Sequence, residues 1–325
     1  MTTETLTFED NARFVELCGP HDTHLMLLEQ RLGVELLPRG NTITLKGPEG
    51  AREEARAALT ALYQRLQKGL ELSLPDVEAA LRLLGEGEAD AETGKPAPKD
   101  LTLTLPRRSI TPRTPAQAHY MNALRENELV FGVGPAGTGK TYLAVAHGIS
   151  MLLRGEVERL ILSRPAVEAG ERIGFLPGDM KEKVDPYLRP LYDALYDVVH
   201  ADLVDKRIEK NEIEIAPLAF MRGRTLARAY VILDEAQNAS IAQMKMFLTR
   251  LGEGSRMVIT GDPSQTDLPN PSESGLADAL GLLTNIEGVA VTRFTGDDVV
   301  RHRLVRDIVK AYDDRAARRA APRQA

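Results

Sequence analysis

The chain has 325 residues, of which 43% are hydrophobic, and its formal net charge is −6 at pH 7. This length allows two domains with buried cores, and the negative charge argues against a protein that coats nucleic acid indiscriminately. The single cysteine, Cys18, excludes an intramolecular disulfide and suits a reducing compartment. No basic segment opens the chain, and no apolar run approaches the ~20 residues of a membrane span. We therefore expect a cytoplasmic protein without a membrane partner.

The first 75 residues predict a small α+β domain. The expected elements are a strand at 6–8, helices at 11–17 and 23–32, strands at 34–37 and 42–45, and a long amphipathic helix at 49–67. This β-α-α-β-β-α order resembles a KH domain, a module that binds single-stranded nucleic acid. Residues 1–75 are therefore expected to be KH-like.

A KH domain clamps the nucleic-acid backbone with a G-x-x-G loop between its first two helices. The corresponding loop here is Gly19-Pro20-His21-Asp22, which ends in aspartate and contains neither lysine nor arginine. Asp22 places a negative charge where a phosphate should approach. Two interpretations stay open: a specialised RNA-binding unit, or a KH-shaped module used for protein contacts or ring assembly.

Residues 76–105 are predicted to be a flexible linker, because the stretch 85–99 has many chain breakers and no apolar period. The core domain is expected at 106–312. Residues 313–325 form a basic tail that we expect to be solvated.

A complete G-x-x-x-x-G-K-T phosphate-binding loop lies between an apolar strand at 129–133 and a helical stretch at 141–153. Its residues are Gly134, Pro135, Ala136, Gly137, Thr138, Gly139, Lys140 and Thr141. The glycines allow backbone N–H groups and the helix N-terminus to point at a phosphate chain. Lys140 is expected to reach the β- and γ-phosphates, and the Thr141 hydroxyl to ligate Mg²⁺. The chain should bind a nucleoside triphosphate.

Two acidic residues follow the buried-strand run at 229–233. Asp234 ends this strand, where it can hold Mg²⁺ bound to a neighbouring phosphate loop. The adjacent Glu235 can orient and deprotonate an attacking water, which a pure binding site does not need. A third strand end follows the run 256–260 and reads Gly261-Asp262-Pro263-Ser264-Gln265. Gln265 is expected to contact the γ-phosphate or the attacking water.

Together these strings resemble the PhoH-like ATPases, single-core relatives of superfamily 1 helicases. The resemblance covers about residues 100–312 and rests on the phosphate loop, on the segments 231–240 and 244–269, and on shorter strings at 163–171, 175–179, 221–225 and 298–302. It implies ATP hydrolysis coupled to RNA metabolism, with oligomeric rings and a ribonuclease partner in some members. We expect an α/β P-loop NTPase with a parallel RecA-like sheet, plus the KH-like domain.

The resemblance also suggests which residue selects adenine. Gln117 begins the helix before the first core strand, where a glutamine of helicase-like ATPases reads the adenine edge. No T-K-x-D or N-K-x-D string, which would read guanine, occurs in the chain.

A catalytic arginine is harder to place. The candidates are Arg164, Arg222, Arg224 and Arg301. By resemblance Arg164 contacts the nucleic-acid backbone, and we take Arg301, which opens the expected last helix, as the catalytic arginine. Helicases take such arginines partly from a second core domain that this chain is too short to contain. The site should therefore be completed by a neighbouring subunit of a homo-oligomer.

We thus predict an ATPase in which Mg²⁺ is shared between Thr141 and Asp234, Glu235 activates water, and single-stranded RNA is bound and remodelled, with a ribonuclease as a possible partner. An ATP-regulated oligomeric scaffold that binds protein and never translocates is the main alternative. A small-molecule kinase fits Glu235 and Gln265 less well.

Overall fold

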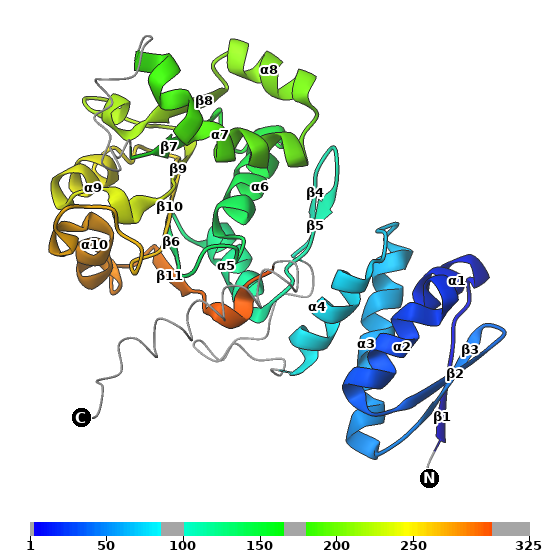
Figure 1. Cartoon of the computed structure of the whole chain (residues 1–325). Helices are drawn as coiled ribbons and strands as arrows, with labels where there is room; N and C mark the ends of the chain where they lie inside the picture. Colours follow the sequence, from blue (N-terminus) through cyan, green and yellow to red (C-terminus); the bar gives the residue numbers. More distant parts are fainter. Residues whose placement is uncertain (1–2, 86–100, 166–179, 301–325) are drawn as a thin grey trace, which may run out of the picture. The chain divides into compact units, whose positions relative to one another are not determined.

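The computed structural model of the chain describes residues 3–85, 101–165 and 180–300 (Figure 1). These residues form two compact units, one within Met1–Thr102 and Thr111–His119, the other within Leu103–Ile110 and Tyr120–Ala325. The predicted boundaries at 105 and 312 stay predictions, and the predicted tail lies outside the described residues. Among the described helices, none combines the length and the apolar character that crossing a membrane requires.

The smaller unit contains an antiparallel sheet of order β1-β3-β2, with helices packed on one face. Its elements are β1 (Thr3–Thr7), α1 (Asn11–Cys18), the 3₁₀ turn η1 (Pro20–Asp22), α2 (Thr23–Leu32), β2 (Glu35–Arg39), β3 (Thr42–Lys46), α3 (Glu49–Gln67) and α4 (Leu74–Gly85). In β3 the alternation is plain, because Ile43 and Leu45 are fully buried while their neighbours are half-exposed. Up to α3 the observed order is the predicted one.

The loop between α1 and α2 has the backbone of a glycine-rich turn. Gly19 has φ +78°, and Asp22 has φ +59° and ψ 23°, in the left-handed region. Aspartate is one of the few residues with a side chain that enters this region readily. Asp22 therefore keeps a turn that glycine would favour and adds a negative charge to it. The KH-like assignment and its two interpretations stay predictions.

Helix α4 corrects the sequence prediction, which began a flexible linker at residue 76. Val77 is fully buried in the core of the smaller unit, and Leu81 and Leu84 pack against that core. An ion pair of 3.2 Å between Arg65 and Asp76 joins α3 to the first turn of α4. These apolar residues recur at helical spacing. The prediction missed the helix because it extended the linker back from the run at 85–99, which is rich in chain breakers.

The larger unit is built on a parallel sheet of order β11-β6-β10-β9-β7-β8 within the described residues. The strands are β6 (Leu129–Val133), β7 (Arg159–Arg164), β8 (Ile213–Pro217), β9 (Ala229–Leu233), β10 (Arg256–Gly261) and β11 (Val289–Arg293). Helices cover both faces, so every residue of β6 and of β9 is buried. The predicted α/β fold of a P-loop NTPase with a parallel sheet is confirmed.

Different helices cover the two faces of this sheet (Figure 1). The described helices of the unit are α5 (Pro115–Glu126) from Tyr120 onward, α6 (Lys140–Leu153), α7 (Met180–Val198), α8 (Ala201–Glu209), α9 (Ile241–Leu248) and α10 (Gly275–Leu283). A small hairpin joins β4 (Leu103–Thr104) to β5 (Ser109–Ile110). Helices α6 and α7 pack on one face, and α9 and α10 on the other. All six described strands of this sheet end at the same edge, and the loops after β6, β9 and β10 carry the phosphate loop, Asp234, Glu235 and Gln265.

Helix α6 packs so closely on β7 and β9 that a side chain at one position would clash with buried residues of both strands. A Cβ atom at Gly148 would lie 2.6 Å from Cδ1 of Tyr230 and 2.8 Å from Cδ1 of Leu160. Both side chains are fully buried. The phosphate-binding helix is therefore held against the sheet by a contact of its own backbone.

We expect Gly148→Ala to lower the free energy of unfolding by about 1–3 kcal/mol through overpacking. By helix propensity alone, replacing glycine with alanine would stabilise the helix by about 1 kcal/mol. A net loss of stability would therefore report the clash. Gly281 in α10 is the matched control, because a Cβ atom there meets nothing within 4 Å. Gly281→Ala should be neutral or stabilising in urea unfolding, and a gain at both positions would contradict the packing of α6 on β9.

His147 is a second buried group on α6. Its side chain is 2% exposed, its ring centroid lies 5.6 Å from that of Tyr230, and its Nδ1 atom has no hydrogen-bond partner in the described structure. Burial, aided by the charges of Arg256, Arg154 and Arg125, lowers the pKa of His147 from 6.5 to about 3. The imidazole is therefore neutral in the folded protein at neutral pH.

In the unfolded chain the His147 imidazole is protonated as the pH falls below its pKa of 6.5, whereas in the folded protein it stays neutral down to about pH 3. Its contribution to stability is therefore complete above pH 6.5 and is lost as the pH falls through this window. We expect His147→Phe to reduce the slope of unfolding free energy against pH by up to ~1.4 kcal/mol per pH unit. Urea unfolding of both proteins between pH 7 and 4 measures the difference, and parallel curves would refute a neutral buried imidazole.

Candidate active site

The phosphate loop joins the buried strand β6 to helix α6 and is shaped by left-handed glycines. Gly134, Gly137 and Gly139 have φ of +139°, +84° and +88°. At Gly134 a Cβ atom would lie 2.3 Å from the carbonyl oxygen of Phe294, so the neighbouring chain also demands glycine there. The loop thus leads directly into the N-terminus of α6, where backbone N–H groups can bind an anion.

Lys140 folds back over this loop. Its Nζ atom donates hydrogen bonds to the carbonyl oxygens of Gly134, at 2.6 Å, and of Pro135, at 2.7 Å. The side chain is 7% exposed. A triphosphate in the loop would offer Nζ charged acceptors, which bind an ammonium more strongly than neutral carbonyls.

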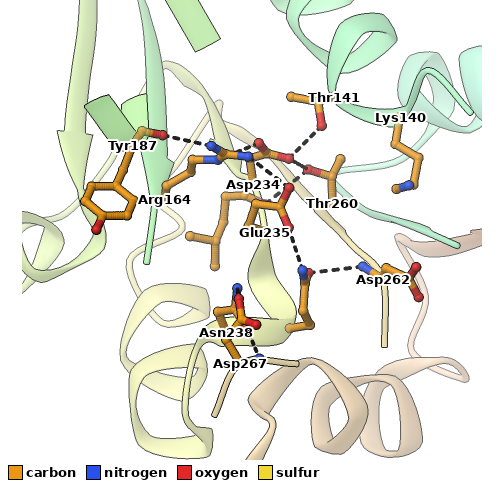
Figure 2. Close-up of polar contacts among 12 residues, drawn as sticks. Lys140, Thr141, Arg164, Tyr187, Asp234, Glu235, Asn238, Thr260, Asp262 and Asp267 are labelled. Atoms are coloured by element: carbon orange, nitrogen blue, oxygen red, sulfur yellow. Dashed lines mark hydrogen bonds and ion pairs between the residues drawn. The ribbon is translucent and has the colours of Figure 1, made fainter. Parts of the chain in front are cut away.

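Asp234 follows β9 and collects partners from three other elements (Figure 2). Its Oδ1 atom accepts hydrogen bonds from the hydroxyls of Thr141, at 2.6 Å, and Thr260, at 2.7 Å. Its Oδ2 atom accepts from Nε of Arg164 at 2.8 Å. Asp234 is only 4% exposed, and such a buried charge requires partners of this kind.

The Thr141 hydroxyl and the Asp234 carboxylate fit a Mg²⁺ ion. Both are oxygen donors, and their contact places them on one side of the phosphate loop. Within the described residues, no group of three or more His, Cys, Asp or Glu side chains could hold a metal by itself. Protein sites commonly bind Mg²⁺ with one or two carboxylates, the substrate phosphates and water.

Glu235 is held in a strained conformation beside Asp234. Its φ of 53° and ψ of 39° are left-handed, which is uncommon for a residue other than glycine. Its Oε1 atom accepts from Nη2 of Arg164 at 2.9 Å, and its Oε2 atom accepts from Nε2 of Gln237 at 2.5 Å. The side chain is still 45% exposed, so water can reach the carboxylate.

Gln237 connects this carboxylate to the loop after β10, a link that the sequence analysis missed. While its Nε2 atom binds Glu235, its Oε1 atom accepts from the backbone N–H of Asp262 at 3.1 Å. Gln265 then donates to Oδ2 of Asp262 at 2.8 Å. The predicted γ-phosphate sensor, Gln265, is therefore tied to Glu235 through two intervening residues. The signal for this link in the sequence was the glutamine two residues after Glu235, in Asp234-Glu235-Ala236-Gln237.

The arginine predictions have mixed outcomes. Arg164 was expected at the nucleic-acid backbone, whereas its guanidinium lies between Asp234 and Glu235, because β7 pairs directly with β9. Arg224 makes two hydrogen bonds to Glu214, at 2.6 and 2.7 Å, which raise the pKa of its guanidinium. This bidentate pair occupies Arg224 within its own subunit.

The remaining candidates stay predictions. Arg222 is exposed, and Arg301 lies outside the described residues. Gln117 is 4% exposed and its Oε1 atom accepts from the backbone N–H of Arg113 at 2.8 Å. It belongs to Thr111–His119, which groups with the smaller unit, and its role in reading adenine is a prediction still.

Comparison with known proteins gives consistent matches. The sequence profile of the family described as PhoH-like protein matches residues 109–313. A "PhoH-like protein" of Bacillus subtilis (strain 168) is 50% identical over 299 residues, which cover 92% of this chain and 93% of that protein. The "PhoH-like protein" of Mycobacterium tuberculosis (strain ATCC 25618 / H37Rv) is 47% identical over 320 residues, covering 94% and 89%.

Among solved structures, the Sulfolobus solfataricus SWI2/SNF2 ATPase core in complex with dsDNA aligns with a TM-score of 0.32 and 16% identity. The alignment covers 54% of this chain and 42% of that chain. This similarity is too distant to carry an argument.

Gly261 at the end of β10 makes room for Gln237. A Cβ atom there would lie 2.6 Å from Oε1 of Gln237 and 2.8 Å from Cδ2 of Leu276. We expect Gly261→Ala to destabilise the protein by about 1–3 kcal/mol in urea unfolding. In a Gln237→Ala background the cost should shrink, because the nearer clash is gone.

The control for this cycle is Gly296→Ala, where a Cβ atom meets nothing within 4 Å. It should cost little in either background. An equal cost of Gly261→Ala with and without Gln237 would show that the amide does not fill this space.

Proposed function

The chain belongs to the PhoH-like protein family, and we propose that it is a Mg²⁺-dependent ATPase that couples hydrolysis to the binding and remodelling of RNA. The observation that carries the proposal is the placement of Glu235. A site that only binds nucleotide needs the phosphate loop and Asp234. A second carboxylate that is clamped, strained and open to water fits hydrolysis.

Each residue of the site has a separate role in the proposed hydrolysis. The loop at 134–141 binds the phosphates, with Lys140 on the β- and γ-phosphates. Thr141 and Asp234 would hold Mg²⁺, which when bound would supply positive charge to the phosphate oxygens. Glu235 accepts the proton of the attacking water. Gln265 contacts the γ-phosphate or this water, and the Asp262–Gln237 connection links it to Glu235.

An arginine for the transition state would come from a neighbouring subunit. Such a residue is worth about 10³–10⁵ in rate. Arg164 and Arg224 are engaged within the chain, which leaves Arg222 and Arg301. Arg301 is our candidate, and the active protein would be a homo-oligomeric ring. Gln117 would read adenine.

For the coupled process we propose single-stranded RNA as the ligand, remodelled or presented to a ribonuclease. The support is the element order of the smaller unit, which resembles an RNA-binding module, together with the helicase-like strings of the larger one. The second candidate is an ATP-regulated protein scaffold. Asp22 favours it, because a carboxylate in the loop between α1 and α2 repels phosphate.

We expect Glu235→Gln to lower the steady-state rate of ATP hydrolysis by about 10²–10⁴-fold, because the amide cannot take the proton of water. Binding of a fluorescent ATP analogue should persist, since the phosphate loop is intact. Glu253→Gln, at an exposed glutamate in the turn before β10, is the matched control and should hydrolyse ATP like the wild type. Equal activity in all three proteins would refute the role of Glu235.

The same assay with single-stranded RNA separates the two coupled functions. We expect RNA to raise the Glu235-dependent rate several-fold. A rate that is indifferent to RNA and DNA, combined with ATP-dependent binding of a protein, would instead support the scaffold. Phosphate transferred to a metabolite would refute both.

A further inference from the structure

Arg164 is fixed by three hydrogen bonds at the edge of the sheet that carries Asp234 and Glu235. It ends β7, its side chain is 15% exposed, and each nitrogen of the guanidinium has its own acceptor (Figure 2). Nε donates to Asp234 at 2.8 Å, Nη2 to Glu235 at 2.9 Å and Nη1 to the carbonyl oxygen of Tyr187 in α7 at 2.8 Å. The planar fork of arginine makes this three-way contact, and a lysine cannot copy it.

The contact also sets the charge of the site. Two carboxylates, Asp234 and Glu235, stand next to one another and would repel if nothing lay between them. The guanidinium lies between them, and the second cation of the site, Lys140, covers the phosphate loop. The four groups carry two positive and two negative charges. Without nucleotide the charges of these four groups therefore cancel.

A divalent cation that enters this site alone would meet an arginine already bound to the carboxylate it needs. Repulsion between like charges is strong at short range where water is largely excluded. A triphosphate changes the balance, because it brings the negative charge that a metal ion compensates. The site should accept the metal together with the nucleotide and reject it by itself.

We propose that Arg164 is a positioning residue that holds the Glu235 carboxylate for catalysis and keeps divalent metal out of the site until nucleotide brings it. The proposal rests on the proposed ATPase for its first part only. The second part concerns the charge of the nucleotide-free site and can be tested without any turnover.

The first experiment titrates Mn²⁺ into nucleotide-free protein and follows the loss of the free-ion electron paramagnetic resonance signal. We expect the wild type to bind Mn²⁺ weakly and Arg164→Gln to bind it several-fold more tightly, because the competing charge is gone. Asp234→Asn in the Arg164→Gln background should abolish the gain, which places the ion at this carboxylate. Unchanged Mn²⁺ affinity in Arg164→Gln would overturn the proposal.

Arg164→Lys tests the charge of the side chain separately from the geometry of the guanidinium. It also provides a second variant in case Arg164→Gln does not fold. Lysine keeps the positive charge, so Mn²⁺ should bind as weakly as in the wild type. It loses the fork that holds Glu235, so kcat should fall by roughly 10-fold or more. KM for ATP should change little, because Asp234 keeps its contacts with Thr141 and Thr260. Tighter Mn²⁺ binding in Arg164→Lys would refute the electrostatic argument.

The matched control is Arg154→Gln, which removes an exposed arginine that pairs with Glu156 at the far end of α6. It should change neither metal affinity nor turnover, since surface ion pairs contribute little. If wild-type protein does not hydrolyse ATP, the proposed function fails, yet the Mn²⁺ titration still decides whether Arg164 excludes metal.

Discussion

The charge buried at the end of β9 is the constraint on which the rest of the site depends. Asp234 is almost removed from water, and a carboxylate in that position persists only when it is paired and hydrogen-bonded. Its partners come from the start of α6, from β10 and from the end of β7. The strand order β10-β9-β7 brings them to one point, because all these strands run parallel and end at the same edge. The order of the strands thus supplies the partners of Asp234. An arrangement without these partners would leave a buried charge unpaired, which costs free energy.

The parts of the site that could be predicted from the sequence are those that local chain geometry determines. The phosphate loop needs only a strand, three glycines in left-handed conformations and a helix, and all of these are consecutive. Arg164 was misplaced because its role depends on which strand lies beside β9, and adjacency in a sheet is a long-range property. Gln237 was missed for the same reason, since its amide matters only once β10 ends next to β9.

The smaller unit shows the same division between local and long-range information. Its helices and strands up to α3 follow from periodicity and turn residues, and α3 runs over Glu49–Gln67 as expected. The helix α4 escaped notice because its apolar residues gain their significance from the core they cover. In the loop between α1 and α2, charge was readable in the sequence, but the left-handed backbone of Asp22 was not. That backbone explains how an aspartate can occupy a turn suited to glycine.

The left-handed backbone of Glu235 has an evolutionary consequence. A residue with a Cβ atom in this region costs roughly 1–2 kcal/mol relative to its relaxed conformation, and glycine avoids most of that cost. Folding stability and chemistry therefore pull in opposite directions at this position. Selection for thermal stability alone, as in a laboratory evolution experiment without an activity screen, would favour loss of the glutamate. A glutamate at this position therefore carries a backbone cost that only a function of its carboxylate would offset.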